Sequence, residues 1–137
     1  MALILDTGPL FAAMDRSDVD HGRCAALMEG TDEPVIVPAP VIVEVDWLAG
    51  RRLQPGAFLA LLADIQERRL VVEELQVTDY ARSRQLVEKY RDLPLGFVDA
   101  AVISVVERLG ETKLATLDHR HFAVVRPRHL PALRLLP

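Results

Sequence analysis

The segment Met1-Ala-Leu-Ile-Leu-Asp6-Thr7-Gly8-Pro9-Leu10 decides how the rest of the chain is interpreted. Its apolar run from Ala2 to Leu5 is short and unbroken, which is typical of a strand buried on both faces of a parallel sheet. Gly8-Pro9 ends this strand, and proline favours the first turn of a following helix. Ligands of open α/β sheets bind at the carboxyl ends of the strands, so we expect Asp6 where chemistry takes place.

Short apolar runs and helical segments alternate along the remaining chain. This alternation predicts an α/β sandwich with a mainly parallel sheet, in a single domain over residues 1–137. Thr78 is the expected N-cap of one helix, and Gly50 and Gly110 are expected to end two others. We expect strands at 34–38, 70–73 and 113–117, weaker strands at 123–125 and 133–136, and helices at 9–14, 19–29, 40–49, 53–68, 78–90 and 97–109.

The composition excludes several classes of protein. The chain has 137 residues, 50% of them hydrophobic and 26% charged, which is globular composition rather than that of a disordered chain. Its one cysteine, Cys24, predicts a reducing compartment such as the cytoplasm. The sequence shows no signal-peptide pattern and no apolar run long enough to span a membrane.

The charge of the chain limits how it could bind nucleic acid. A net charge of −4 excludes a generally basic surface. The 16 basic residues are fourteen arginines and two lysines. Arginine binds phosphate in a forked geometry that lysine cannot match, although a biased genome composition is the favoured explanation for the arginines.

Two further acids lie in apolar helices. The residues three and four positions from Asp99 are apolar or small, so Asp99 is expected to face inward. The alternative for Asp99 is a carboxylate satisfied by backbone N–H groups at the helix start. Glu44 has similar apolar neighbours, but so does Asp46, and one of the two is expected to point to water.

Asp118 follows the strand predicted at 113–117, just as Asp6 follows the first strand. Because these strands can be neighbours in such sheets, Asp118 is expected near Asp6; a turn or helix N-cap is the alternative. Thr116 lies two residues earlier, on the same side of an extended strand, where its hydroxyl could support the site. Asp92 could join the acids, although a surface turn is the stronger expectation for it.

Carboxylates gathered at one sheet edge must take up protons or bind cations, since two charges ~4 Å apart repel by ~4 kcal/mol at an effective dielectric of 20. Oxygen ligands favour hard cations such as Mg²⁺ and Mn²⁺. Such ions can polarise a phosphodiester and activate a water molecule. Phosphodiester hydrolysis is therefore the reaction that best suits an acid-lined pocket in an arginine-rich chain.

The chain resembles the PIN-domain ribonucleases, and more closely the VapC toxins of bacterial toxin–antitoxin pairs. Four pieces carry the resemblance, in the order and with the gaps that the family shows: Leu3-Ile-Leu-Asp6-Thr7-Gly8-Pro-Leu10, Val41-Ile-Val-Glu44-Val, Leu95-Gly-Phe-Val-Asp99-Ala-Ala and Ala115-Thr116-Leu-Asp118-His-Arg-His-Phe122. The resemblance implies a three-layer α/β/α sandwich with a five-stranded, mainly parallel sheet. It also implies a Mg²⁺- or Mn²⁺-dependent endonuclease that cuts single-stranded RNA.

The resemblance also implies roles and partners. Asp6 and Asp99 match the acids most directly tied to the metal, Glu44 matches a third that binds through water or orients the attacking water, and Asp118 matches a fourth. Thr7 and Thr116 match supporting hydroxyl positions. The implied partners are RNA, a second copy in a homodimer, and a small VapB-like antitoxin that covers the site in a heterotetramer or larger complex. The helices at 41–48 and 58–65 are candidate parts of the antitoxin groove.

The same residues allow three alternative functions. A haloacid-dehalogenase-type phosphatase needs a second Asp two residues after the first, where this chain has Gly8. A zinc site is not favoured, because His21-x-x-Cys24 has no second pair and His119-x-His121 lacks helical ligand spacing. The serious competitor is a PIN-like module that binds RNA or an antitoxin without cutting.

Overall fold

The first apolar run forms a strand buried on both faces, as its sequence predicts. In the computed structural model of the chain, which describes residues 1–53 and 55–137, this strand is the middle one of a five-stranded sheet in the order β3-β2-β1-β4-β5. All four strand pairs are parallel. The strands are β1 (Leu3–Leu5), β2 (Val35–Pro38), β3 (Val71–Glu73), β4 (Lys113–Ala115) and β5 (Arg134–Leu136).

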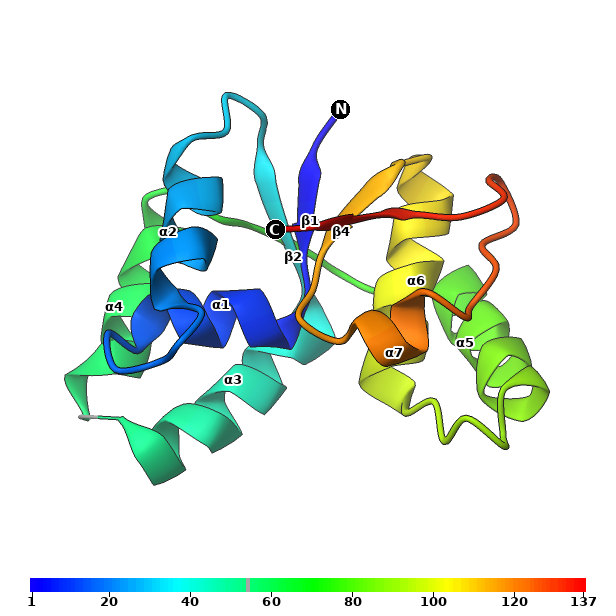
Figure 1. Cartoon of the computed structure of the whole chain (residues 1–137), viewed down its shortest axis with the longest axis horizontal. Coiled ribbons are helices and arrows are strands. Elements are labelled where there is room, and N and C mark those ends of the chain that lie inside the picture. Colours follow the sequence, from blue (N-terminus) through cyan, green and yellow to red (C-terminus); the bar gives the residue numbers. More distant parts are fainter. Residues whose placement is uncertain (54) are drawn as a thin grey trace.

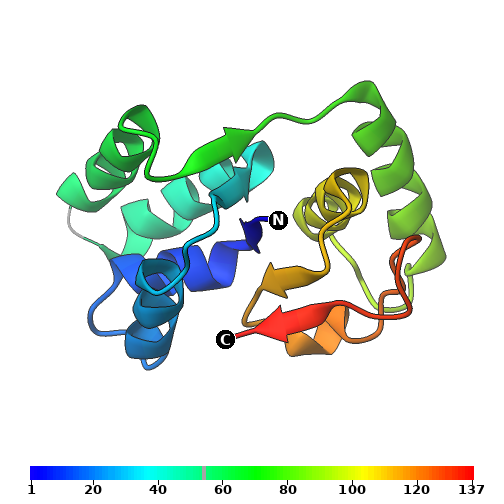
Figure 2. The ribbon, with the colours of Figure 1, turned by 90° about the horizontal axis from the view of Figure 1, so that it is seen from above.

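Helices cover both faces of the sheet, which confirms the predicted three-layer sandwich. Figure 2 shows α1, α2 and α4 on one side and α5 and α6 on the other. α3 packs against α1, α4 and α6, so it links the two helical layers at one end of the sheet. The helices are α1 (Thr7–Met14), α2 (His21–Glu29), α3 (Ala39–Arg52), α4 (Gly56–Gln66), α5 (Val77–Lys89), α6 (Phe97–Leu109) and α7 (His119–Phe122).

Two of the predicted helix caps, those at Gly50 and Thr78, are wrong. Gly50 does not end α3, which continues to Arg52 because its buried face, which includes Val41 and Ala49, holds the helix in place and offsets the cost of one glycine. Thr78 is not the N-cap of α5. The helix starts one residue earlier, because Gln76 and Asp79 form a capping box in which Asp79 Oδ2 accepts a hydrogen bond from the Gln76 backbone N–H.

The segment 123–125 was predicted as a strand, and this prediction is wrong. Its backbone continues the turns of α7 instead: the Ala123 N–H donates to the His119 carbonyl and the Val124 N–H donates to that of His121. The predicted C-cap at Gly110 is confirmed, with a φ of 68° in the left-handed region. The helix start predicted at 53–55 includes residue 54, which lies outside the described residues.

The core lies between the sheet and its helices. Leu3, Ile4 and Leu5 of β1 are almost completely buried, and so is every residue of α6 from 100 to 106. Within the described part of the chain, no helix combines the length and the apolar character needed to cross a membrane.

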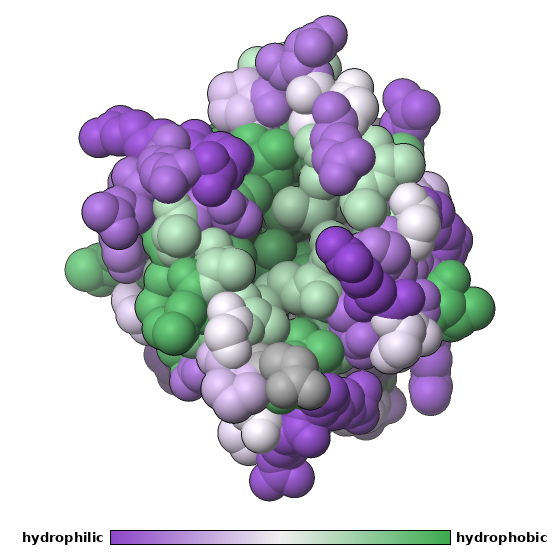
Figure 3. Space-filling model, turned by 90° about the vertical axis from the view of Figure 1, so that its left-hand side faces the viewer, coloured by the Kyte–Doolittle hydropathy of each residue, from purple (hydrophilic) through white to green (hydrophobic). Residues whose placement is uncertain are grey.

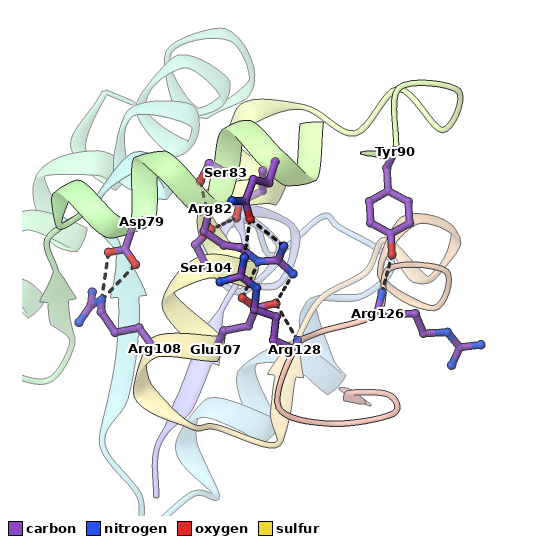
Figure 4. Close-up of polar contacts among 11 residues, drawn as sticks. Asp79, Arg82, Ser83, Tyr90, Ser104, Glu107, Arg108, Arg126 and Arg128 are labelled. Carbon is purple, nitrogen blue, oxygen red and sulfur yellow. Dashed lines mark hydrogen bonds and ion pairs between the residues drawn. The ribbon is translucent and has the colours of Figure 1, made fainter. Parts of the chain in front are cut away.

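A network of ion pairs joins α5 to α6, the two helices on one side of the sheet (Figure 4). Arg82 and Glu107 form a two-pronged pair, with nitrogen–oxygen distances of 2.8 and 2.9 Å. Arg108 lies 3.0 Å from Asp79 Oδ2, and Asp79 itself is only 2% exposed. Between the pairs, the hydroxyls of Ser83 and Ser104 lie 3.1 Å apart. These acids are neutralised within the chain, so the network stabilises the packing of α5 on α6.

We expect the substitution Arg108→Leu to destabilise the protein by about 3 kcal/mol, because it leaves the Asp79 carboxylate buried without its cation. Urea denaturation measures this loss. Arg69→Leu is the matched control: it breaks an exposed pair with Asp64 and should cost less than about 1 kcal/mol. Equal losses in the two variants would show that the Arg108–Asp79 pair has no special importance for the fold.

Candidate active site

The acid that ends β1 lies beside the residues that end β4. In Figure 1 the carboxyl ends of β1, β2 and β4 point to the level at which α1, α3, α6 and α7 begin. The Asp6 backbone N–H donates to the Ala115 carbonyl at 2.9 Å. The hydroxyl of Thr116 donates to Asp6 Oδ2 at 2.8 Å and accepts from the Asp118 N–H at 3.0 Å. The predicted adjacency of the two strands is therefore confirmed, and Thr116 connects the acids that follow them.

A second group of side chains comes from α6 and α7. One ligand atom from each of Asp99, Asp118 and His121 lies within 4.8 Å of the others. Nδ1 of His121 is 2.8 Å from Asp118 Oδ2 and 3.6 Å from Asp99 Oδ2. Asp118 also caps α7, because its Oδ1 accepts the His121 backbone N–H at 3.1 Å. The N-cap considered for Asp118 is therefore present, and its other oxygen still faces the acidic group.

Burial and mutual repulsion disfavour the charged forms of these acids. Burial raises the pKa of Asp6 from an ordinary 3.8 to about 7; the Thr7 backbone N–H and the Thr116 hydroxyl act in the opposite direction, while Asp99 and Glu44 raise it further. The pKa of Asp99 is also raised, first by burial and then by Asp118, and His121 acts against this rise. In their charged forms, Asp6 and Asp99 therefore carry negative charge that the surrounding residues stabilise poorly.

The structure settles which acid of α3 faces the site. Glu44 is half-buried. Burial is the main cause of the raised pKa of Asp6 and of Asp99, and the charge of Glu44 raises both further. Asp46 is exposed and lies over a different hollow, beside Pro55 and Phe58. Asp92 lies in an exposed turn, as expected. Asp6, Glu44, Asp99 and Asp118 are thus gathered at one end of the sheet.

The gathered residues fit a hard divalent cation. Among the residues that the structure describes, no arginine or lysine forms an ion pair with any of the four acids. The hydroxyl of Thr7, next to Asp6, is buried and has no hydrogen-bond partner within residues 1–53 and 55–137. Carboxylate oxygens are the ligands that Mg²⁺ and Mn²⁺ prefer, and a cation would offset the repulsion that raises the pKa values. The site therefore suits metal-assisted chemistry.

An apolar groove with a volume of about 880 Å³ adjoins Glu44. Its wall includes exposed hydrophobic side chains from three helices, namely Val43, Trp47, Tyr80 and Phe97. The Arg51 guanidinium lies 4.0 Å from the Trp47 ring centroid. Because so many large apolar side chains are exposed together beside the acids, this groove is a candidate binding surface.

A second apolar hollow lies between α1, α2 and α4. Figure 3 shows an apolar area surrounded by hydrophilic side chains on the face where α2 and α4 lie. The hollow has a volume of about 550 Å³ and is lined by residues of α1, α2 and α4 that include Met14, Met28 and Leu61. The helix predicted at 58–65 as part of an antitoxin groove contributes to this hollow, whereas the helix at 41–48 contributes to the first groove.

The sequence interpretation missed His121 as a member of the site. The spacing His119-x-His121 does not indicate a metal site, because alternate residues of a helix face different ways. The useful spacing is instead that of Asp118 and His121, three residues apart at the start of a helical turn, which puts both side chains on one side.

Comparison with known proteins finds similarity over nearly the whole chain. The sequence model of the PIN domain family matches residues 3–126. Ribonuclease VapC26 of Mycobacterium tuberculosis is 28% identical over 125 residues, which are 91% of this chain and 93% of that protein.

Solved structures share the fold at lower sequence identity. The crystal structure of Mycobacterium tuberculosis VapC20, a Sarcin-Ricin loop cleaving toxin, has a TM-score of 0.76 and 21% identity, covering 82% of this chain and 86% of that one. VapBC2 from Rickettsia felis, bound to a DNA fragment from its promoter, has a TM-score of 0.72 and 14% identity over 100% of both chains. FitAcB from Neisseria gonorrhoeae has a TM-score of 0.67 and 12% identity, covering 98% and 96%.

The raised pKa of Asp6 predicts how the stability of the metal-free protein depends on pH. The folded state holds the proton of Asp6 more tightly than the unfolded state does, so this carboxyl lowers stability as the pH rises from about 4 to about 7. We expect Asp6→Asn to remove this decline, a difference of up to about 4 kcal/mol between pH 4 and pH 8. Urea denaturation in EDTA measures it.

Asp92→Asn is the control for this prediction, because Asp92 is exposed and should leave the pH dependence of stability unchanged. If Asp6→Asn shows the same decline with pH as the unsubstituted protein, Asp6 is not the buried, proton-holding group that the structure indicates.

Proposed function

Because the chain belongs to the PIN-domain family, we propose that it is a Mg²⁺- or Mn²⁺-dependent endonuclease that cuts single-stranded RNA as the toxin of a toxin–antitoxin pair. The observation that carries the proposal is the gathering of Asp6, Glu44, Asp99 and Asp118 at one end of the sheet with no arginine or lysine paired to them among the described residues. The similarity to Ribonuclease VapC26 supports RNA as the substrate. In this proposal residues 1–137 form one nuclease domain.

We assign the four acids different roles in this proposal. Asp6 and Asp99 hold the cation directly; the burial of both acids and the effect of the Asp99 charge on the pKa of Asp6 support this assignment. Asp118 completes the ligand set through Oδ2. Glu44 approaches from α3, on the side of the apolar groove, where it orients the water that attacks the phosphodiester.

The two threonines support these acids. The Thr116 hydroxyl holds Oδ2 of Asp6 and so fixes the direction of the other carboxylate oxygen. The Thr7 hydroxyl has no hydrogen-bond partner among the described residues and could bond a water molecule at the site. When bound, a divalent ion supplies polarisation of the phosphate, activation of water and neutralisation of the leaving oxygen.

We expect Asp99→Asn to lower RNA cleavage at least about 100-fold, because it removes a charged ligand while keeping the shape of the side chain. Cleavage of total cellular RNA in Mg²⁺ and in EDTA, with sequencing of the new RNA ends, measures this and also names the substrate. Thermal unfolding and circular dichroism establish that the variant is folded. Asp92→Asn, in the exposed turn before α6, is the matched control and should cut normally.

Calorimetric titration with Mg²⁺ distinguishes the nuclease from a PIN-like module that binds without cutting. A nuclease binds Mg²⁺ in the unsubstituted form and loses affinity in the Asp99→Asn variant. Cleavage retained by that variant would remove Asp99 from the site. Absence of any metal-dependent cleavage, in a protein that still binds RNA or an antitoxin, would favour the inert module.

We further propose that the protein forms a homodimer and is held inactive by a small antitoxin. The similarity of the fold to VapBC2 and FitAcB supports this proposal. The groove that exposes Val43, Trp47 and Phe97 adjoins Glu44, so a peptide segment in the groove would also restrict access to the acids. An exposed apolar surface of this kind gains free energy when a partner covers it.

The substitution Trp47→Ala should weaken binding of the antitoxin about 10- to 100-fold, because large aromatic side chains contribute most to such interfaces. The measurement uses the product of a short reading frame upstream of the gene and titrates it into the purified toxin. Val19→Ala is the control, since Val19 is an exposed apolar residue in the turn before α2. Unchanged affinity in the Trp47 variant would exclude this groove as the antitoxin site.

A further inference from the structure

The His121 side chain faces the acidic site, although only the backbone N–H of this residue takes part in the hydrogen bonds described above. It lies on α7, directly before the buried Phe122, and its side chain is about 20% exposed. Its Nδ1 atom is buried and finds no hydrogen-bond partner in the part of the chain that the structure describes. This nitrogen nevertheless lies 2.8 Å from Asp118 Oδ2 and 3.6 Å from Asp99 Oδ2. The distance to Asp118 is that of a hydrogen bond, but the direction is not.

We propose that Nδ1 of His121 is a nitrogen ligand of the divalent ion, which it shares with the carboxylates of Asp99 and Asp118. This inference rests on the metal-dependent function proposed above. It adds a fifth residue to the four acids, and this residue binds through nitrogen, whereas the acids bind through oxygen. The three ligand atoms lie within 4.8 Å of one another, a spread that one ion can bridge.

The start of α7 fixes the direction of these ligands. Oδ1 of Asp118 accepts the backbone N–H of His121, so this oxygen is occupied and Oδ2 is the one that remains. The same hydrogen bond holds His121 one turn from Asp118, which puts the two side chains on one face. The Asp118 N–H in turn donates to Thr116, which anchors the turn to the end of β4. The position of Nδ1 therefore follows from the backbone of the site rather than from a flexible side chain alone.

A ligand interaction explains the geometry better than an ion pair does. An imidazolium in this place would point its N–H at a carboxylate oxygen, yet Nδ1 lacks that alignment with both acids. A neutral imidazole presents a lone pair, and several ligand atoms that face one ion lie near one another without bonding among themselves. Histidine is a common metal ligand in proteins, and it binds the metal as the neutral imidazole.

A nitrogen ligand changes which ions the site prefers. Mg²⁺ favours oxygen ligands, whereas imidazole suits the ions of the first transition series. We therefore expect the site to bind Mn²⁺ more tightly than Mg²⁺, and this preference to depend on His121. His119 provides a matched control, because it lies on the same short helix but is exposed and is absent from the cluster.

The test uses the full chain loaded with Mn²⁺ and measures electron spin-echo envelope modulation, which detects ¹⁴N bound directly to the ion. The unsubstituted protein and His119→Leu should show the ¹⁴N coupling of one imidazole, and His121→Leu should not. Calorimetric titrations complete the test. His121→Leu should weaken Mn²⁺ binding at least about 10-fold and Mg²⁺ binding less than about 3-fold, while His119→Leu changes neither.

Each other result overturns the inference in a recognisable way. Mn²⁺ bound without ¹⁴N coupling in the unsubstituted protein would exclude histidine as a ligand and leave the proposed nuclease function intact; this reading does not depend on any variant folding. Coupling that persists in His121→Leu, or that disappears in His119→Leu, would assign the nitrogen to another residue. Failure of the unsubstituted protein to bind Mn²⁺ or Mg²⁺ at all would remove both the inference and the metal dependence of the proposed function.

Discussion

The parallel pairing of β1 with β4 is the constraint on which the site depends. Leu5 lies opposite Ala115, so the residues that follow the two strands emerge side by side. Asp6 and Thr116 then meet at 2.8 Å, although 110 residues separate them in the chain. Since β1 is buried on both faces and pairs with β2 on its other edge, it cannot slide without losing contacts in every direction. The rigidity of the core thus determines the separation of the first and last acids.

The chain places buried acids in two different ways. On α5 and α6, Asp79 and Glu107 each lie against an arginine, so their charges are neutralised when the protein folds. At the end of the sheet the acids have no such arginine or lysine among the described residues, and burial raises the pKa of Asp6 to about 7. The first arrangement stabilises the fold, whereas the second costs stability until a cation arrives. This difference, within one molecule, distinguishes a structural network from a candidate metal site.

The short helix α7 contributes to both the site and the core. Its N-cap is an acid of the site, its third residue is His121, and Phe122 anchors it in the core. Because one carboxylate oxygen of Asp118 is committed to the cap, the helix and the ligand set depend on the same side chain. The apolar groove beside Glu44 lies at the same end of the sheet, so chemistry and the recognition of a partner are neighbours in space.

Much of the fold and of the site could be predicted from the sequence. The unbroken apolar run before Asp6, the alternation of strands and helices, and the apolar neighbours of Asp99 are local patterns, and burial on a sheet or a helix face imposes them directly. Local patterns could not choose between Glu44 and Asp46, since both have apolar neighbours along the helix; only the packing of α3 against α1 and α6 turned Glu44 toward the acids. They could not extend α3 past Gly50, because tertiary contacts outweigh the small cost of one glycine. Nor could they bring in His121, whose place depends on how the end of β4 leads into α7 beside α6. What the sequence by itself determined is the set of elements and most of the acids. The tertiary structure alone decided which side chains meet, because the distances between atoms on different elements arise from packing that no single segment contains.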